Sequence, residues 1–149
     1  MIAATGGTVR VQDEGSQLVA LALAAAAPIT SGERWLDLCA GPGGKTALLA
    51  AIAREHDVTL EANEVIPTRA RLVRNALRAV PGEVVVHEED GRSFGASHPG
   101  AFDRILVDAP CTGLGALRRR PEARWRKTPA DVAELVPLQV ELLSSALHA

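Results

Sequence analysis

Short apolar runs alternate with helix-forming segments through most of this chain, and that alternation limits its fold more than any other feature. Four runs have the length and composition of buried strands: 34–38, 58–62, 83–87 and 102–107. Segments of helical composition lie before and between them, at 17–27, 45–54 and 68–80. Strands joined by helical connections pair in parallel, and helices cover both faces of such a sheet. The sequence therefore predicts an α/β fold with one parallel sheet.

Composition supports a single globular domain and excludes several other classes. The chain has 149 residues, of which 47% are hydrophobic and 23% charged, and its formal net charge is −2. No apolar run approaches the roughly 18 residues that a membrane span needs, and the first residues lack a secretory leader. Two cysteines, Cys39 and Cys111, fit a reducing compartment better than a disulfide framework. We therefore predict a cytoplasmic chain without membrane contact, and we assign it no metal ligands and no oligomeric state.

Polar residues follow each predicted strand at the point where it ends. A cysteine and glycine loop follows the first strand, Glu64 the second, Asp90 the third, and Asp108 with Cys111 the fourth. Ligands of parallel α/β sheets bind at the carboxyl ends of the strands. We therefore expect these residues to surround one binding site.

The loop and the two following acids indicate an adenosine ligand that carries positive charge. The loop matches neither GxGxxG nor GxxxxGK[ST], which disfavours a nucleoside triphosphate. Glu64 lies twenty residues after Gly44, where an acid accepts hydrogen bonds from ribose hydroxyls, and Asp90 is placed to accept from an adenine amine. A sulfonium and an ammonium group favour carboxylates, so S-adenosylmethionine is the predicted cofactor. The alternative is that Glu64 is a surface acid and Asp90 caps a turn.

The sequence Asp-Ala-Pro-Cys at 108–111 is the sharpest chemical feature. Carbon 5 of a pyrimidine is a weak nucleophile, and thiolate addition at carbon 6 is the usual way to activate it. A carboxylate beside the base can hold its N3 and N4 edge. The alternative is a capping Asp108 and an inert, buried Cys111.

A basic cluster follows that loop. The segment 118–127 holds six cations against the single acid Glu122, a local charge of +5. Such a cluster with an embedded Trp125 suits contacts with a nucleic-acid backbone and a stacked base, although a solvated basic loop is the alternative. The candidate RNA-binding residues are Arg118, Arg119, Arg120, Arg124, Trp125 and Arg126.

Several strings together resemble the Fmu/Sun (Nop2-like) family of RNA cytosine-5 methyltransferases. Residues 36–46 (LDLCAGPGGKT) are similar to the family's cofactor loop almost letter for letter. Residues 11–17, 90–92, 103–111 and 118–125 follow the family's other motifs in the same order. The resemblance implies a Rossmann-like class I methyltransferase fold, with 1–15 as a lead-in segment and 16–149 as the N-terminal two thirds of the domain. That domain would therefore be incomplete at its C-terminal end, with an exposed edge beside the fourth strand.

The same resemblance implies roles for the site residues. Glu64, where the family usually has Asp, would take the ribose and Asp90 the adenine. Asp108 would lie between cofactor and target base, and Lys45 and Asp108 would contact the cytosine. Cys111 would assist product release, whereas the attacking thiol belongs to a later Thr-Cys motif that this sequence lacks. The cofactor loop itself would comprise Cys39, Ala40, Gly41, Pro42, Gly43, Gly44 and Lys45.

The predicted function is S-adenosylmethionine-dependent methylation of carbon 5 of cytosine in RNA, of the 16S ribosomal type, by a full-length parent. A second hypothesis is a non-catalytic fragment that binds cofactor and RNA. A third, a DNA cytosine-5 methyltransferase, is disfavoured because the loop is not of the Phe-x-Gly type and the Glu-Asn-Val motif is missing.

Overall fold

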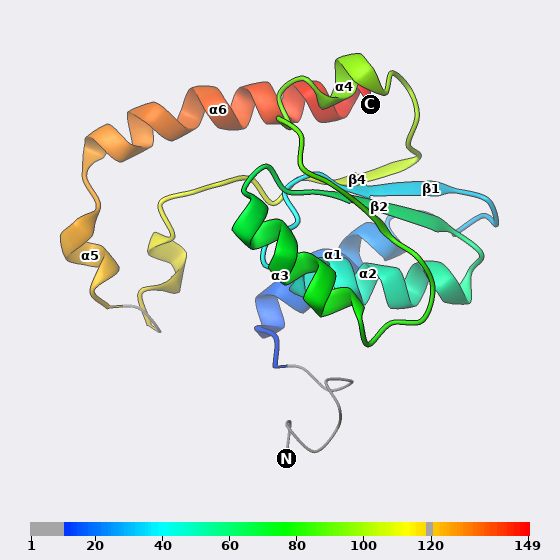
Figure 1. Ribbon diagram of the computed structural model, residues 1–149. Coiled ribbons are helices and arrows are strands. Elements are labelled where there is room, and N and C mark those ends of the chain that lie inside the picture. Colours follow the sequence, from blue (N-terminus) through cyan, green and yellow to red (C-terminus); the bar gives the residue numbers. More distant parts are fainter. Residues whose placement is uncertain (1–10, 119–120) are drawn as a thin grey trace.

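The computed structural model describes residues 11–118 and 121–149, which form an α/β fold with one parallel sheet (Figure 1). The strands are β1 (Arg34–Asp37), β2 (Thr59–Asn63), β3 (Val85–His87) and β4 (Arg104–Leu106), in the spatial order β3-β2-β1-β4. All three neighbouring pairs are parallel, which confirms the predicted fold class. Within the described residues, β4 is an edge strand with no outer neighbour.

Helices cover both faces of the sheet. The helices α1 (Glu14–Ala25), α2 (Gly44–Glu55) and α3 (Pro67–Leu77) lie on one face in Figure 1. The short α4 (Phe94–Ser97) and the long α6 (Pro129–His148) lie on the other. Side chains that alternate along each strand therefore enter two separate apolar cores, one on each face of the sheet.

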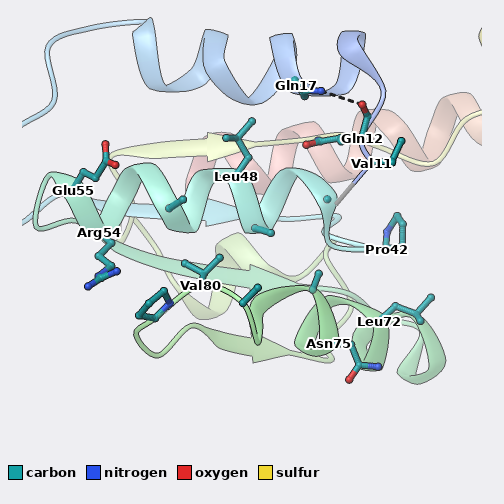
Figure 2. A pocket seen from close by; sticks show the side chains of 16 residues that line it. Val11, Gln12, Gln17, Pro42, Leu48, Arg54, Glu55, Leu72, Asn75 and Val80 are labelled. Carbon is teal, nitrogen blue, oxygen red and sulfur yellow. Dashed lines mark hydrogen bonds between the residues drawn. The ribbon is translucent and has the colours of Figure 1, made fainter. Parts of the chain in front are cut away.

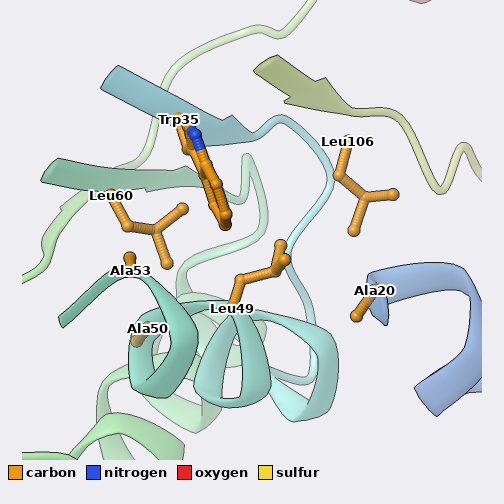
Figure 3. Packing of buried hydrophobic residues seen from close by; sticks show 7 residues of the cluster. All are labelled: Ala20, Trp35, Leu49, Ala50, Ala53, Leu60 and Leu106. Carbon is orange, nitrogen blue, oxygen red and sulfur yellow. The ribbon is translucent and has the colours of Figure 1, made fainter. Parts of the chain in front are cut away.

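The core beneath α1 and α2 is centred on Trp35, which is fully buried (Figure 3). Leu49 from α2 and Leu106 from β4 point toward the same space. Leu36, the next residue along β1, enters the opposite core with Phe94 and Leu142. Each large apolar side chain buried in this way contributes about 1.5–3 kcal/mol to folding, so the two cores fix the position of β1 between its neighbours.

Arg104, the first residue of β4, links this edge strand to α1. Its guanidinium donates to the Glu33 carboxylate, with an Nε to Oε2 distance of 2.8 Å, and to the carbonyl oxygens of Leu23, Ala24 and Ala27. These carbonyls lie at and just beyond the C-terminal end of α1, where carbonyl oxygens run short of helical donors and a cation is favourable.

Several element boundaries differ from the sequence prediction. The third strand begins at Val85 rather than at residue 83, because the Pro81-Gly82 turn extends into this region with Gly82 at φ +110°. The helix predicted to begin at residue 17 begins at Glu14, an acid in its first turn. The helix predicted to reach residue 80 ends at Leu77.

Between β4 and α6 the chain forms only short helical turns, η2 (Leu114–Ala116) and α5 (Ala123–Arg126). The α6 helix then begins with a capping box, in which Thr128 and Asp131 satisfy each other's backbone N–H groups. No helix in the described ranges is long and apolar enough to cross a membrane.

Candidate functional site

Residues from all four strand ends meet around one cavity at the carboxyl edge of the sheet. The cavity has a volume of about 390 Å³. It is lined by Gly41 after β1, Glu64 after β2, Asp90 after β3, and Asp108 and Cys111 after β4. The structure therefore brings together the residues that the sequence placed at one edge, although they are up to 70 positions apart.

A second cavity, of about 530 Å³, lies on the other side of the same loop. It shares Cys39, Gly41 and Asp108 with the first cavity and adds Asp37 and Lys45. A ligand that occupies both cavities would pass over the loop after β1. We call residues 39–45 the glycine loop and these two cavities together the edge site.

A larger cavity, of about 920 Å³, lies elsewhere (Figure 2). It opens between α2, α3 and the segment before α1, with Leu48, Leu72 and Val80 among its lining side chains. None of the predicted acids after the strands lines it. We therefore place the candidate chemistry at the edge site.

Packing holds the glycine loop in place. Gly43 has φ +102°, and a Cβ at this position would lie 2.7 Å from the Cα of Val73 in α3. Only glycine permits this combination of backbone conformation and close approach. Helix α2 starts at the next residue, so its first N–H groups point toward the edge site.

Asp37 at the end of β1 is a buried acid that the sequence reasoning did not single out. Its Oδ2 accepts a hydrogen bond of 2.7 Å from the Thr46 hydroxyl, whereas its Oδ1 has no partner. Burial raises the pKa of Asp37 to about 6, against an ordinary value of 3.8. Asp37 lines the second cavity, where its unpartnered oxygen is a ready acceptor for a ligand donor.

Glu64 lies almost wholly buried, with 4% of its surface exposed. Its Oε2 accepts from the backbone N–H of Gly41 at 3.1 Å, and its Oε1 accepts from that of Ile66 at 3.0 Å. Arg69 donates to the Gly41 carbonyl oxygen at 2.6 Å, and its Nε lies 3.5 Å from Glu64 Oε2. Both oxygens of Glu64 are therefore hydrogen-bonded, Oε2 to the glycine loop and Oε1 to the backbone that leads into α3.

A second set of polar contacts lies around Asp90 and the ends of β2 and β3. The Arg92 guanidinium donates to Asp90 at 2.6 Å and lowers the pKa of this carboxyl. The side chain of Asn63 joins the ends of β2 and β3, because its Oδ1 accepts from the Glu89 N–H and its Nδ2 donates to the Glu89 carbonyl oxygen. Asp90 is thus ionised, and it is half-exposed at the cavity mouth.

The loop after β4, residues 108–111, is held by contacts at its two ends. Lys45 Nζ donates to Asp108 Oδ2 at 2.5 Å, which joins this loop to the glycine loop. Gln139 Nε2 of α6 donates to the Pro110 carbonyl oxygen at 2.7 Å. The Cys111 thiol beside Pro110 belongs to an exposed residue, so a reagent or substrate can reach it.

The two thiols differ in environment. Burial raises the pKa of Cys39 to about 12, and the neighbouring Asp37 and Glu64 charges act in the same direction. Cys39 is therefore a neutral thiol near pH 7 and is unsuited to nucleophilic attack. This agrees with its predicted place in the cofactor loop rather than in catalysis.

The basic segment presents its described cations on the surface. Arg118, Arg124 and Arg126 are exposed, and Trp125 is 83% exposed with the Arg124 guanidinium 5.9 Å from its ring centroid. Arg119 and Arg120 lie outside the described residues. An indole this exposed is available for a planar partner such as a base.

Five polar residues in or beside the edge site were not assigned to it from the sequence: Asp37, Thr46, Asn63, Arg69 and Gln139. Arg69 turns from α3 toward Gly41 and Glu64. Asn63 directly precedes Glu64 at a strand end, so its position was a usable signal. Gln139 carried no comparable signal.

The parallel sheet, the glycine loop and the carboxylates at its edge together define a Rossmann-like methyltransferase domain. Comparison with known proteins gives the family. The model of the family described as 16S rRNA methyltransferase RsmB/F matches residues 24–149. The chain belongs to this family.

Similar proteins agree with that assignment. The chain is 59% identical to "Putative methyltransferase Rv1407" of Mycobacterium tuberculosis, a match over 95% of the chain and 30% of the relative. It is 40% identical to ribosomal RNA small subunit methyltransferase B of Salmonella paratyphi B, over 93% of the chain and 31% of the relative. The chain thus spans about a third of the length of these curated relatives.

Solved structures show the same fold. The structure of PH0851 matches with a TM-score of 0.87 and 30% identity, over 98% of the chain and 32% of that protein. The structure of NSun6 from Pyrococcus horikoshii with SFG matches with a TM-score of 0.76 and 24% identity, over 91% of the chain and 33% of that protein.

Proposed function

We propose that the edge site binds S-adenosylmethionine and that the chain is the cofactor-binding part of an RNA cytosine-5 methyltransferase acting on 16S-type ribosomal RNA. The observation that carries the proposal is the convergence of Glu64, Asp90 and Asp108 on the glycine loop around the edge site. Carboxylates suit a ligand with hydroxyls, an amine and two positive groups, and the first cavity has the size of small-molecule sites, about 300–1,000 Å³.

Each acid has a separate task in this proposal. Glu64 accepts from the ribose hydroxyls with the lone pairs that its backbone donors leave free, and Asp90 accepts from the adenine amine. Asp37 and Asp108 attract the positive end of the cofactor. When bound, the cofactor supplies an electrophilic methyl group on its sulfonium. The NSun6 structure, a protein of the same fold, was solved with SFG, which supports a small-molecule ligand for this fold.

The target cytosine would lie against Lys45 and Asp108. Asp108 Oδ2 accepts from the amine of the base, which breaks its 2.5 Å bond with Lys45 and frees the Lys45 ammonium to donate. Cys111, exposed beside this pair, assists removal of the carbon-5 proton and release of the product. The basic segment would hold the RNA backbone, with Trp125 stacked on a base and Arg118, Arg119, Arg120, Arg124 and Arg126 on phosphates.

Residues 1–149 alone are proposed to bind cofactor and RNA without turnover. A cytosine-5 methyltransferase needs one thiolate to attack carbon 6 in addition to the release function assigned to Cys111. The other thiol of this chain, that of Cys39, is partly buried, and burial raises its pKa to about 12. The attacking thiol and the rest of the enzyme would come from other parts of the full-length protein, which we place in the cytoplasm.

Two measurements test the function. Calorimetric titration of S-adenosylmethionine into the chain should give saturable binding that E64Q weakens about tenfold or more, since one hydrogen-bonding charge contributes about 1.5–3 kcal/mol. Absence of binding would refute the preformed cofactor site. Methyl transfer from labelled cofactor to ribosomal RNA by the full-length protein should place the label on carbon 5 of cytosine, and a label on guanine or adenine would refute the assigned chemistry.

A further inference from the structure

Glu64 reaches back across the glycine loop into space that an alanine at position 41 would fill. A Cβ built on Gly41 would lie 2.1 Å from Glu64 Oε2 and 3.0 Å from Glu64 Cδ. It would also lie 2.8 Å from Arg69 Nε. Contacts under 3.0 Å force a displacement, and Glu64 is buried with both oxygens bonded to backbone N–H groups.

Gly41 is needed for space and not for its backbone conformation. Gly43, two residues later, has φ +102°, whereas Gly41 is absent from the positive-φ glycines of the described chain. Alanine could therefore adopt the Gly41 backbone without strain. The three atoms nearest to a side chain there all belong to Glu64 and Arg69.

An aspartate at position 64 would remove the Glu64 part of that obstacle and leave only the Arg69 Nε atom, at 2.8 Å, to shift. Its carboxylate would withdraw by about 1.5 Å, one carbon–carbon bond length, which opens room at position 41.

We propose that Gly41 and Glu64 are a matched pair that sets the ribose-binding part of the edge site. Gly41 is the positioning residue, because its missing side chain lets the longer carboxylate lie along the loop with its free lone pairs toward the first cavity. Arg69 keeps the pair together through the Gly41 carbonyl oxygen and the Glu64 carboxylate. This inference rests on the proposed cofactor function.

A double-mutant cycle of G41A, E64D and G41A/E64D in the full chain tests the pair. G115A is the matched control, because a Cβ on Gly115 meets no atom within 4 Å. G41A should weaken S-adenosylmethionine binding at least about tenfold and lower the unfolding temperature, since buried overpacking costs about 1–3 kcal/mol. E64D alone should weaken binding less, and G115A should change neither quantity.

The decisive result is rescue. G41A/E64D should bind the cofactor at least about threefold more tightly than G41A, and it should unfold at a higher temperature. If G41A does not fold, a cooperative unfolding transition in G41A/E64D counts as the rescue. The proposal of a matched pair is overturned if G41A/E64D loses as much cofactor affinity and stability as the two single variants lose together, or more.

The cycle also separates the two proposals. If the unchanged chain binds no S-adenosylmethionine, the proposed function fails, and the unfolding temperatures still decide whether the two residues are sterically matched. If the unchanged chain binds the cofactor but E64D gives no rescue, the matched pair fails and the proposed function stands.

Discussion

The glycine loop and the loop after β4 border the same site but are held in different ways. Packing fixes the glycine loop, because Gly43 lies against α3 and Asp37, Thr46 and Glu64 are buried around it. The loop after β4 is exposed at Asp108 and Cys111 and is held by one contact from Lys45 and one from Gln139. The binding side of the site is thus part of the core, whereas the reactive side is attached to it by polar contacts.

The largest expected effect tests whether the glycine loop is part of the core. G43A should lower the free energy of unfolding by at least about 3 kcal/mol, because it combines a strained backbone with overpacking against Val73. G113A, after β4, should cost only about 1–2 kcal/mol, because φ is +73° there but the space is open. Chemical denaturation measures both, and equal costs would remove the contrast between the loops.

A pH series tests the buried acid of the same region. The folded-state pKa of Asp37, about 6, exceeds its ordinary 3.8. The folded chain therefore binds this proton more tightly than the unfolded chain. Stability from Asp37 is greatest below pH 4, declines as the pH rises to 6, and falls by about 3 kcal/mol in total. D37N should remove this decline from denaturation curves, and an unchanged pH dependence would show that Asp37 does not titrate there.

A thiol-reactivity measurement tests the attachment of the second loop. Cys111 should react with iodoacetamide in the folded chain much faster than Cys39, since Cys39 is only partly exposed and its raised pKa, about 12, keeps it protonated. Q139M removes the donor to Pro110 and should raise the Cys111 rate about fivefold, because one hydrogen bond contributes about 1 kcal/mol. V140M, at the next, exposed position of α6, is the control. Identical rates in Q139M and V140M would mean that Gln139 does not hold this loop.

The smallest effect on folding is expected at Trp125, in the basic segment that follows the loop after β4. W125A should change the free energy of unfolding by less than about 0.5 kcal/mol, because the indole is 83% exposed. It should weaken RNA binding about fivefold or more, since base stacking contributes about 1–3 kcal/mol. Filter binding with a ribosomal RNA fragment measures this loss, and calorimetry should show unchanged S-adenosylmethionine affinity. Equal losses of both ligands would assign Trp125 a structural role.

The sequence allowed the sheet and its functional edge to be predicted because both depend on local pattern. Apolar runs mark the strands, and the carboxyl ends of parallel strands share an edge, so Glu64, Asp90 and Asp108 could be grouped without knowledge of any contact. Strand lengths were harder to predict, because β3 pairs with β2 over just three residues and the apolar run around it is longer.

Contacts between distant residues could not be predicted in the same way. Gln139 lies 29 positions after Pro110, on a helix whose rotation about its axis depends on tertiary packing. Arg69 occupies a helix with several other arginines, and nothing in their spacing distinguishes the one that turns toward Glu64. The Gly41–Glu64 fit depends on a distance of a few ångströms, which no sequence pattern encodes.

Helix α6 begins directly after the basic segment and lines the first cavity with Leu138 and Leu142. The ten residues from Thr128 to Leu138 rise about 15 Å at 1.5 Å per residue. Its far end is tied to the fold, since the Ala149 carbonyl oxygen accepts from the Phe102 N–H at 3.0 Å. The helix therefore keeps a constant separation between the basic segment, where an RNA backbone would be held, and the edge site, where a base would react.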